Sequence, residues 1–318
     1  GAGNASNTVN NTFTVDLTDP TVSITGPADG STTSDDTPTI TGTVSEPVAT
    51  VTVEITDSNG NVIETLTPTV GAGGGWTVDA SQLADGDYTV SATATDAAGN
   101  SATDAHTATI DATAPAVALL TPANNTSTND DTPTVSGTAE VGSTVTVEIT
   151  DNNGNVVETQ TPAVNGAGAW SFDAAQLADG AYTVTATATD AAGNSATAGP
   201  NTFTVDTAGP NLTFDSPADG STTNDNTPTV SGTTDLLANV TVRVLDSNGN
   251  EVQVLATSNL GGNWETNTLA LSDGTYTFEA TASDLAGNTT TITHTVTIDT
   301  TAPGLTLATP ASGSTTND

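Results

Sequence analysis

Apolar and polar residues alternate with a period of two along most of this chain, which predicts β-strands with one buried face. In 50–56, valine and isoleucine alternate with threonine and glutamate, and in 88–95 tyrosine, valine and alanine alternate with threonine and serine. Asn59-Gly60, which follows the first of these segments, predicts a two-residue hairpin turn because both positions accept positive φ angles. No segment shows the period of an amphipathic helix. The chain is therefore expected to be all-β.

The pattern returns three times with a period of about 95 residues. Trp76, Trp170 and Trp264 are 94 residues apart, and each is followed by TATDAAGN or a close variant of it. A unit of this length can hold its own core, so each repeat is expected to be a domain. The predicted domains are 17–111, 112–206 and 207–299.

The two flanking segments match parts of the same repeat. Residues 1–16 match the last strand of a preceding repeat, and residues 300–318 match the first strand and loop of a following one. We therefore expect the chain to be an excerpt of a longer array.

The strand count within one repeat indicates the fold. The strands expected in the first repeat are 21–25, 38–44, 50–56, 62–67, 76–79, 88–95 and 105–110. Seven short strands in about 95 residues are typical of an immunoglobulin-like (Ig-like) β-sandwich. The predicted fold is thus a tandem array of seven-stranded Ig-like β-sandwiches, arranged as an elongated rod, with one tryptophan in each core.

The charge of the chain excludes several classes of function. There are 37 acidic residues against a single base, Arg243, and the formal net charge is −36. Nucleic acid is excluded as a partner because phosphate contacts need basic side chains. Direct membrane insertion is excluded because the apolar runs are too short. Cysteine is absent, so disulfides, thiolate zinc sites and thiol nucleophiles are excluded as well.

Several motifs together resemble the bacterial Ig-like repeats of giant surface adhesins and biofilm-associated proteins. They are DATAP at 111–115, NDDTPTVSGTAEVGSTVTV at 129–147 and LADGAYTVTATATDAAGN at 177–194. The resemblance implies type I secretion to the extracellular bacterial surface. It implies a structural extender that projects a terminal adhesive domain in cell adhesion and biofilm formation. It also implies calcium at the domain junctions, where the ion stiffens the rod.

The acidic loops predict calcium independently of that resemblance. In a sandwich the loops alternate between two ends, so carboxylates at the C-terminal end of one repeat should meet those at the N-terminal end of the next. Carboxylates within about 6 Å of one another repel unless a cation lies among them, and Ca²⁺ prefers such oxygen ligands. At the first junction the predicted ligands are Asp35, Asp36, Asp85, Asp111, Glu140, Asp190 and Asn194. At the second junction they are Asp130, Asp131, Asp179, Asp206, Asp235, Asp284 and Asn288.

The alternative interpretation is that these are turn residues without a metal, because Asp, Asn and Gly favour turns by themselves. The segment 57–61 is interpreted as such a turn, since it lacks the twelfth-position glutamate of a calcium-binding EF-hand loop. His106 and His294 occupy one position of the last strand, where the second repeat has Asn201. Asparagine cannot replace a catalytic base, so a structural role is expected there.

Enzymatic activity is not expected. The acidic pairs recur on turns in every repeat, and no phosphate-binding loop, Ser-His-Asp set or HExxH motif stands out. The neighbouring repeats of the same chain are the expected partners. Two alternatives to the extender role stay open: a module that binds a glycan or a host protein, and a segment of a filament or sheath built by lateral contacts between chains.

The third repeat diverges most, at Asp235-Leu236-Leu237. This segment is predicted to form a junctional loop. Its two leucines are expected to be buried against the preceding domain, because exposed apolar side chains are unfavourable in water.

Overall fold

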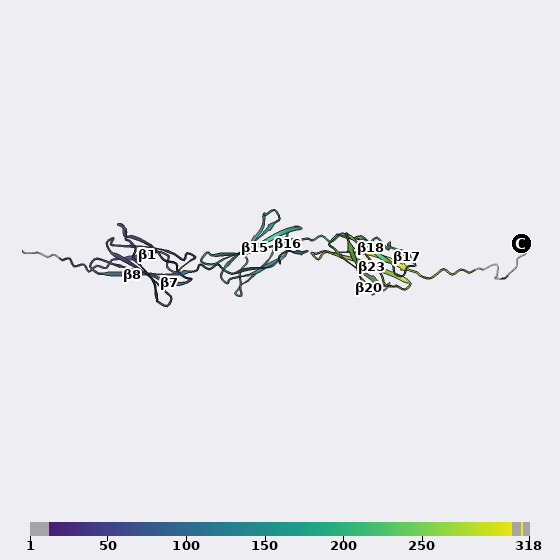
Figure 1. The fold of residues 1–318 in the computed structure, drawn as a ribbon, viewed down its shortest axis with the longest axis horizontal. Coiled ribbons are helices and arrows are strands. Elements are labelled where there is room, and N and C mark those ends of the chain that lie inside the picture. The colour runs from purple at the N-terminus through teal and green to yellow at the C-terminus, as the bar shows by residue number, and fades with distance from the viewer. Residues whose placement is uncertain (1–12, 307–312, 314–318) are drawn as a thin grey trace, which may run out of the picture.

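Three β-sandwiches follow one another along the computed structural model of the chain, and together they form an elongated rod (Figure 1). The structure describes residues 13–306 and 313, and that part of the chain contains no helix. Its strands form three three-stranded and three five-stranded sheets. The all-β fold of tandem Ig-like sandwiches predicted from the sequence is confirmed.

The first sandwich combines a sheet of order β1-β3-β6 with a sheet of order β2-β8-β7-β4-β5. Its strands are β1 (Val22–Gly26), β2 (Ser31–Thr33), β3 (Thr39–Val44), β4 (Thr50–Asp57), β5 (Val62–Leu66), β6 (Gly75–Asp79), β7 (Gly86–Thr95) and β8 (Ser101–Ile110).

The second sandwich repeats this topology, with sheets of order β14-β11-β9 and β10-β16-β15-β12-β13. Its strands are β9 (Val117–Thr121), β10 (Thr126–Thr128), β11 (Thr134–Ala139), β12 (Thr144–Asp151), β13 (Val156–Gln160), β14 (Ala169–Asp173), β15 (Gly180–Thr189) and β16 (Ser195–Val205).

The third sandwich differs in its smaller sheet, which has the order β18-β22-β21, beside a sheet of order β17-β24-β23-β19-β20. Its strands are β17 (Ser221–Thr223), β18 (Thr229–Thr233), β19 (Asn239–Leu245), β20 (Glu251–Ala256), β21 (Ser258–Leu260), β22 (Asn263–Asn267), β23 (Gly274–Ser283) and β24 (Thr289–Ile298). The strand equivalent to β1 is reduced here to two isolated bridges, Leu212 with Thr234 and Ser216 with Ser231.

Each of the strands predicted in the first repeat overlaps an observed strand, and β2 is an additional one. β2 consists of three polar residues, so it carries no alternation to reveal it, and only its parallel pairing with β8 makes it a strand. β8 begins at Ser101, earlier than predicted, because it pairs with β7 along its whole length.

The predicted turn at Asn59-Gly60 is present, but its two-residue geometry was wrong. Within this loop only Gly60 has a positive φ, of 79°. The loop runs from Asp57 to Asn61, and the Asp57 carboxylate accepts the backbone N–H groups of Asn59 and Asn61 at 2.9 Å each. The side chain of Asp57 therefore closes a wider turn.

The core of each sandwich is a separate cluster of buried side chains. Trp76, Trp170 and Trp264 are buried in these clusters, as predicted. Each tryptophan lies opposite a glycine of the adjacent strand, as in the pair of Trp170 and Gly137. The indole covers the space that a side chain would otherwise occupy.

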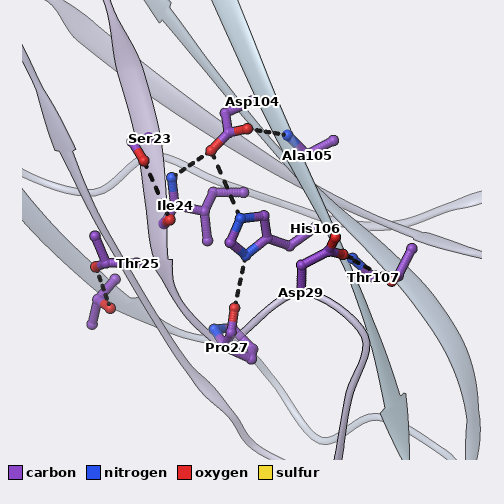
Figure 2. Close-up of polar contacts among 10 residues, drawn as sticks. Ser23, Ile24, Thr25, Pro27, Asp29, Asp104, Ala105, His106 and Thr107 are labelled. Atoms are coloured by element: carbon purple, nitrogen blue, oxygen red, sulfur yellow. Dashed lines mark hydrogen bonds and ion pairs between the residues drawn. The ribbon is translucent and has the colours of Figure 1, made fainter.

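In the first two sandwiches the chain crosses from one sheet to the other between its first two strands, and a residue of the last strand bonds this crossing segment. At the crossing in the first sandwich, His106 of β8 donates from Nδ1 to the carbonyl oxygen of Pro27 at 2.9 Å (Figure 2). Asp104 accepts the N–H of Ile24 at 2.8 Å. In the second sandwich Asn201 makes the bond to Pro122. These bonds agree with the structural role expected at this position.

The predicted flanking strands are only partly covered by the structure. Residues 1–12, 307–312 and 314–318 lie outside the described residues, and the adjoining described segments 13–16 and 300–306 contain no strand.

Candidate functional site: the domain junctions

The preceding sandwich holds the linker at the first junction through one carboxylate. Asp85 lies in the loop before β7, and its Oδ1 accepts the N–H of Ala112 at 2.8 Å. Its Oδ2 accepts the hydroxyl of Thr113. The linker then reaches Pro115, which is buried. The residues that leave the first sandwich are thus fixed by its own loop.

The following sandwich holds the same linker through one amide. Asn194, in the loop between β15 and β16, donates from Nδ2 to the carbonyl oxygen of Asp111 at 2.6 Å. The Asp190 carboxylate accepts both the N–H and the Nδ2 group of Asn194, at 2.9 and 3.0 Å. This pair of bonds orients the amide toward the linker. We call the carboxylate of the preceding sandwich and this asparagine the junction clamp.

The clamp recurs at the second junction. Asp179 accepts the N–H and the hydroxyl of Thr207 at 3.0 and 2.8 Å. Asn288 donates to the carbonyl oxygen of Asp206 at 2.6 Å, and Asp284 orients its amide.

Halves of the clamp also occur at the outer ends of the described array. Asn100 donates to the carbonyl oxygen of Asp16 at 3.2 Å, before the first sandwich. Asp273 accepts the N–H of Thr300 at 2.9 Å, after the third. The device is therefore built into the repeat rather than into one junction.

Hydrogen bonding lowers the pKa of two aspartates at the first junction. The pKa of Asp85 lies below its ordinary value of 3.8, because the N–H of Ala112 and the hydroxyl of Thr113 stabilise the charged form. Partial burial raises the pKa of Asp190, but the bonds from Asn194 and the loop N–H groups outweigh it and the net shift is downward. The negative charge is compensated here by oriented N–H dipoles.

Of the predicted calcium ligands, four lie in turns of their own sandwich at its C-terminal end. Asp35 and Asp130 accept the N–H of the threonine two residues later, at 3.0 and 2.9 Å. Asp36 and Asp131 accept the amide of a nearby glutamine at 2.7 Å.

The N-terminal ends carry two further predicted ligands. Glu140 donates its N–H to the carbonyl oxygen of Ala116 at 2.9 Å. Asp235 accepts the N–H of Asn211 at 2.9 Å. Both contacts hold the segment that enters the sandwich.

The predicted ends do meet, through Asp111 with Asn194 and Asp206 with Asn288. The contact is an amide bonded to a backbone carbonyl oxygen. Among the described residues, no group of three or more His, Cys, Asp or Glu side chains is arranged to hold a metal ion. Calcium binding at the junctions stays a prediction.

Two linker threonines that bind the clamp carboxylates, Thr113 and Thr207, were not predicted from the sequence. A signal for them exists, because a threonine follows the terminal aspartate of every repeat within two residues. The role of Asn194 and Asn288 as donors to the linker was not predicted either. An asparagine side chain has both an amide oxygen that can bind a metal and an amide N–H that can donate to a carbonyl group, so the residue type does not show which of them is used.

The predicted burial of Leu236 and Leu237 was wrong. Their side chains are 72% and 78% exposed, although they lie beside the second sandwich. The linker approaches the third sandwich through Gly209 instead, where an added methyl group would lie 2.7 Å from the Thr290 hydroxyl. Because the third sandwich is contacted through this linker, the loop that carries Leu236 and Leu237 is not covered by the second sandwich.

The repeats match a known family along most of their length. The bacterial Ig-like domain family matches residues 8–112, 121–207 and 213–300. The chain belongs to the bacterial Ig-like domain family. Group 3 of the bacterial Ig-like domains also matches, over residues 75–161. Among curated proteins, no relative matches this bacterial Ig-like chain.

Solved structures similar to this chain include tandem repeats of large adhesins. A tetra-tandem repeat in the extending region of a large adhesion protein has 32% identity, with 89% of this chain and 74% of that chain covered and a TM-score of 0.33. A structure from a 1.5-MDa bacterial ice-binding adhesin has 22% identity and a TM-score of 0.35, and the match covers 89% of this chain and 100% of that chain. A fragment of three titin domains has 14% identity and a TM-score of 0.47, and the match covers 89% of this chain and 100% of that chain.

Ig-like repeats of this kind are structural, non-enzymatic modules. The first and second sandwiches each contact the next sandwich of the same chain through the clamp. No helix in the described part of the chain is long and apolar enough to cross a membrane.

Proposed function

We propose that this chain is an extender segment of a secreted adhesin on the bacterial cell surface, where it holds a terminal adhesive domain away from the cell during adhesion and biofilm formation. The periodic junction clamp is the observation that carries the proposal. An extender needs each domain to keep its direction relative to the next. A linker bonded to the domains on both of its sides meets that need, because it removes the free rotation of an unbonded linker.

The strength of one clamp can be estimated from its bonds. A single amide–carbonyl bond stabilises a structure by about 1 kcal/mol net, so its loss shifts the ratio of clamped to open junctions about fivefold. In an array of many repeats, a small increase in the fraction of open junctions adds a bend at many places along the rod. An extender of many repeats is therefore sensitive to each clamp.

The test removes the two junctional amides. We expect Asn194→Ala combined with Asn288→Ala to reduce the maximum dimension of the chain and broaden its distribution, because open junctions let the rod bend. Small-angle X-ray scattering of the purified chain, with single-particle images of the interdomain angles, measures both quantities.

The chain offers a matched control. Asn155 and Asn250 make the same bonds to an aspartate four residues earlier, at 2.9 and 3.0 Å, but within hairpins of their own sandwich. Asn155→Ala combined with Asn250→Ala should leave the dimensions of the rod unchanged. Equal bending in both double variants would mean that the amides act on domain stability rather than on the junction.

Calcium is the alternative means of stiffening. Asp206, Asp235 and Asp284 line one groove at the second junction, which is the observation that favours it. In this alternative, the ion would add to the clamp and not replace it. The effect of chelation on the dimensions of the rod distinguishes stiffening by calcium from stiffening by the clamp alone.

A further inference from the structure

A groove lined by leucines and aspartates lies at the second junction. It has a volume of about 470 Å³ and lies between the end of the second sandwich and two loops of the third. Its large apolar side chains are Leu236 and Leu237 from one loop and Leu285 from the other. These side chains are 72%, 78% and 73% exposed, so an apolar surface faces water at this junction.

The leucines are specific to this junction. At the first junction the second sandwich has Val141 and Gly142 in place of the leucine pair, and Ala191 in place of Leu285. The repeat therefore folds without them. Exposed apolar side chains that cluster between domains are typical of a surface that binds a partner.

The rim of the groove is acidic. Asp206 from the second sandwich and Asp235 and Asp284 from the third line it. The carboxylates of Asp235 and Asp284 are fixed by the N–H groups of Asn211 and Asn288, at 2.9 Å each. They therefore present negative charge in defined positions around the leucines.

We infer that this groove binds a segment of another protein that carries both aliphatic and basic side chains. The aliphatic groups would cover the leucines, and lysine or arginine would pair with the aspartates of the rim. A second copy of this chain does not fit, because the sequence holds one basic residue against 37 acidic ones. This binding goes beyond the extender role and does not depend on it.

The test compares two synthetic peptides of equal length and charge, one of alternating leucine and lysine and one of alternating serine and lysine. At physiological ionic strength the leucine-lysine peptide should bind the full chain about tenfold more tightly, because only it can cover the apolar part of the groove. Titration calorimetry measures both affinities.

Two variants assign the binding to the groove. Leu236→Ser, Leu237→Ser and Leu285→Ala together should abolish the tenfold preference, and the exposure of all three side chains leaves the fold intact. Asp206→Asn with Asp235→Asn should weaken the leucine-lysine peptide and flatten its salt dependence. The control, Val252→Thr with Val254→Thr, changes exposed apolar residues of β20 away from the groove and should leave both affinities unchanged.

Equal affinity for the two peptides would overturn the inference, because it would mean that the net charge alone attracts them. An unchanged preference in the leucine variant would overturn it as well. So would a concentration-dependent dimer of the parent chain that the leucine variant does not form, since the occupant would then be a second copy. The dimensions of the rod are measured separately, so failure here leaves the extender proposal standing.

Discussion

At the scale of the residue, one short motif serves two purposes in this molecule. An aspartate followed four residues later by an asparagine closes the hairpin of Asp151 and Asn155, and the same pair, Asp190 and Asn194, closes a loop at the junction. In the second case the amide has one N–H left that reaches the carbonyl oxygen of Asp111. The position of the motif in the fold, and not its residue types, decides whether it only closes a loop or also bonds the linker between two domains.

Protonation of these aspartates should weaken the fold in acid. The pKa of Asp151 lies below 3.8 because the side chain and the N–H of Asn155 stabilise its charge. A lowered folded pKa contributes stability above the ordinary value that is lost as the pH falls through the folded value. We expect the free energy of unfolding to decline below about pH 4. Urea titrations from neutral to acidic pH measure it.

The variant Asp151→Asn provides the comparison, since it keeps an acceptor oxygen but cannot titrate. Its free energy of unfolding should depend less steeply on pH than that of the parent chain in the same range. Parallel curves for the two proteins would show that Asp151 contributes nothing to acid sensitivity.

The tryptophan–glycine pair makes a second prediction at this scale. A methyl group at Gly137 would overlap the carbonyl oxygen of Ala118 and the ring of Trp170. Gly137→Ala should therefore destabilise the second sandwich by about 1 to 3 kcal/mol. Tryptophan fluorescence during urea unfolding reports this loss. Gly166→Ala is the control, because its methyl group would meet no atom within 4 Å, and a comparable loss there would contradict the steric explanation.

At the scale of the element, the first two strands of the second sandwich belong to different sheets. β9 pairs with β11 in one sheet, and β10 pairs in parallel with β16 in the other. The crossing between them depends on a side chain of the last strand, Asn201, whose Nδ2 lies 3.0 Å from the carbonyl oxygen of Pro122. One polar residue thus ties the two sheets together at the edge.

Loss of this bond should destabilise the second sandwich. Asn201→Ala leaves the Pro122 carbonyl without its donor, and we expect a loss of about 1 kcal/mol in the free energy of unfolding. Asn201→His should restore most of it, because His106 and His294 make the same bond in the other sandwiches, at 2.9 and 2.8 Å. If histidine were no better than alanine, the bond to the proline would not be the source of the stability.

At the scale of the whole molecule, hydrogen bonds of the clamp connect adjacent sandwiches at the two described junctions, while each sandwich has a core of its own. Domain stability and rod stiffness are therefore separable properties. The net charge of −36 also keeps domains and chains apart, although salt screens it beyond about 8 Å. Repulsion alone does not set the angle between two adjacent domains, because it has no preferred orientation.

Chelation tests what sets this angle. We expect the maximum dimension of the chain in EDTA to equal that in millimolar Ca²⁺, because the clamp consists of amides, carboxylates and carbonyl groups of the chain itself. Small-angle X-ray scattering under both conditions measures it. A rod that bends in EDTA and straightens with calcium would instead support the calcium predicted from the acidic loops.

The sequence alone predicted the period, most of the strands and the sandwich fold, because alternation and turn residues are local signals that recur in every repeat. It also indicated which ends of adjacent domains meet, as Asp111 and Asn194 do. The way in which these ends meet, and the exposure of Leu236 and Leu237, became known only from the three-dimensional arrangement of the domains. The reason is physical: an aspartate or asparagine can bind a metal, cap a turn or bond a neighbouring domain with the same atoms. Which of these it does depends on groups brought within hydrogen-bonding distance from remote parts of the chain.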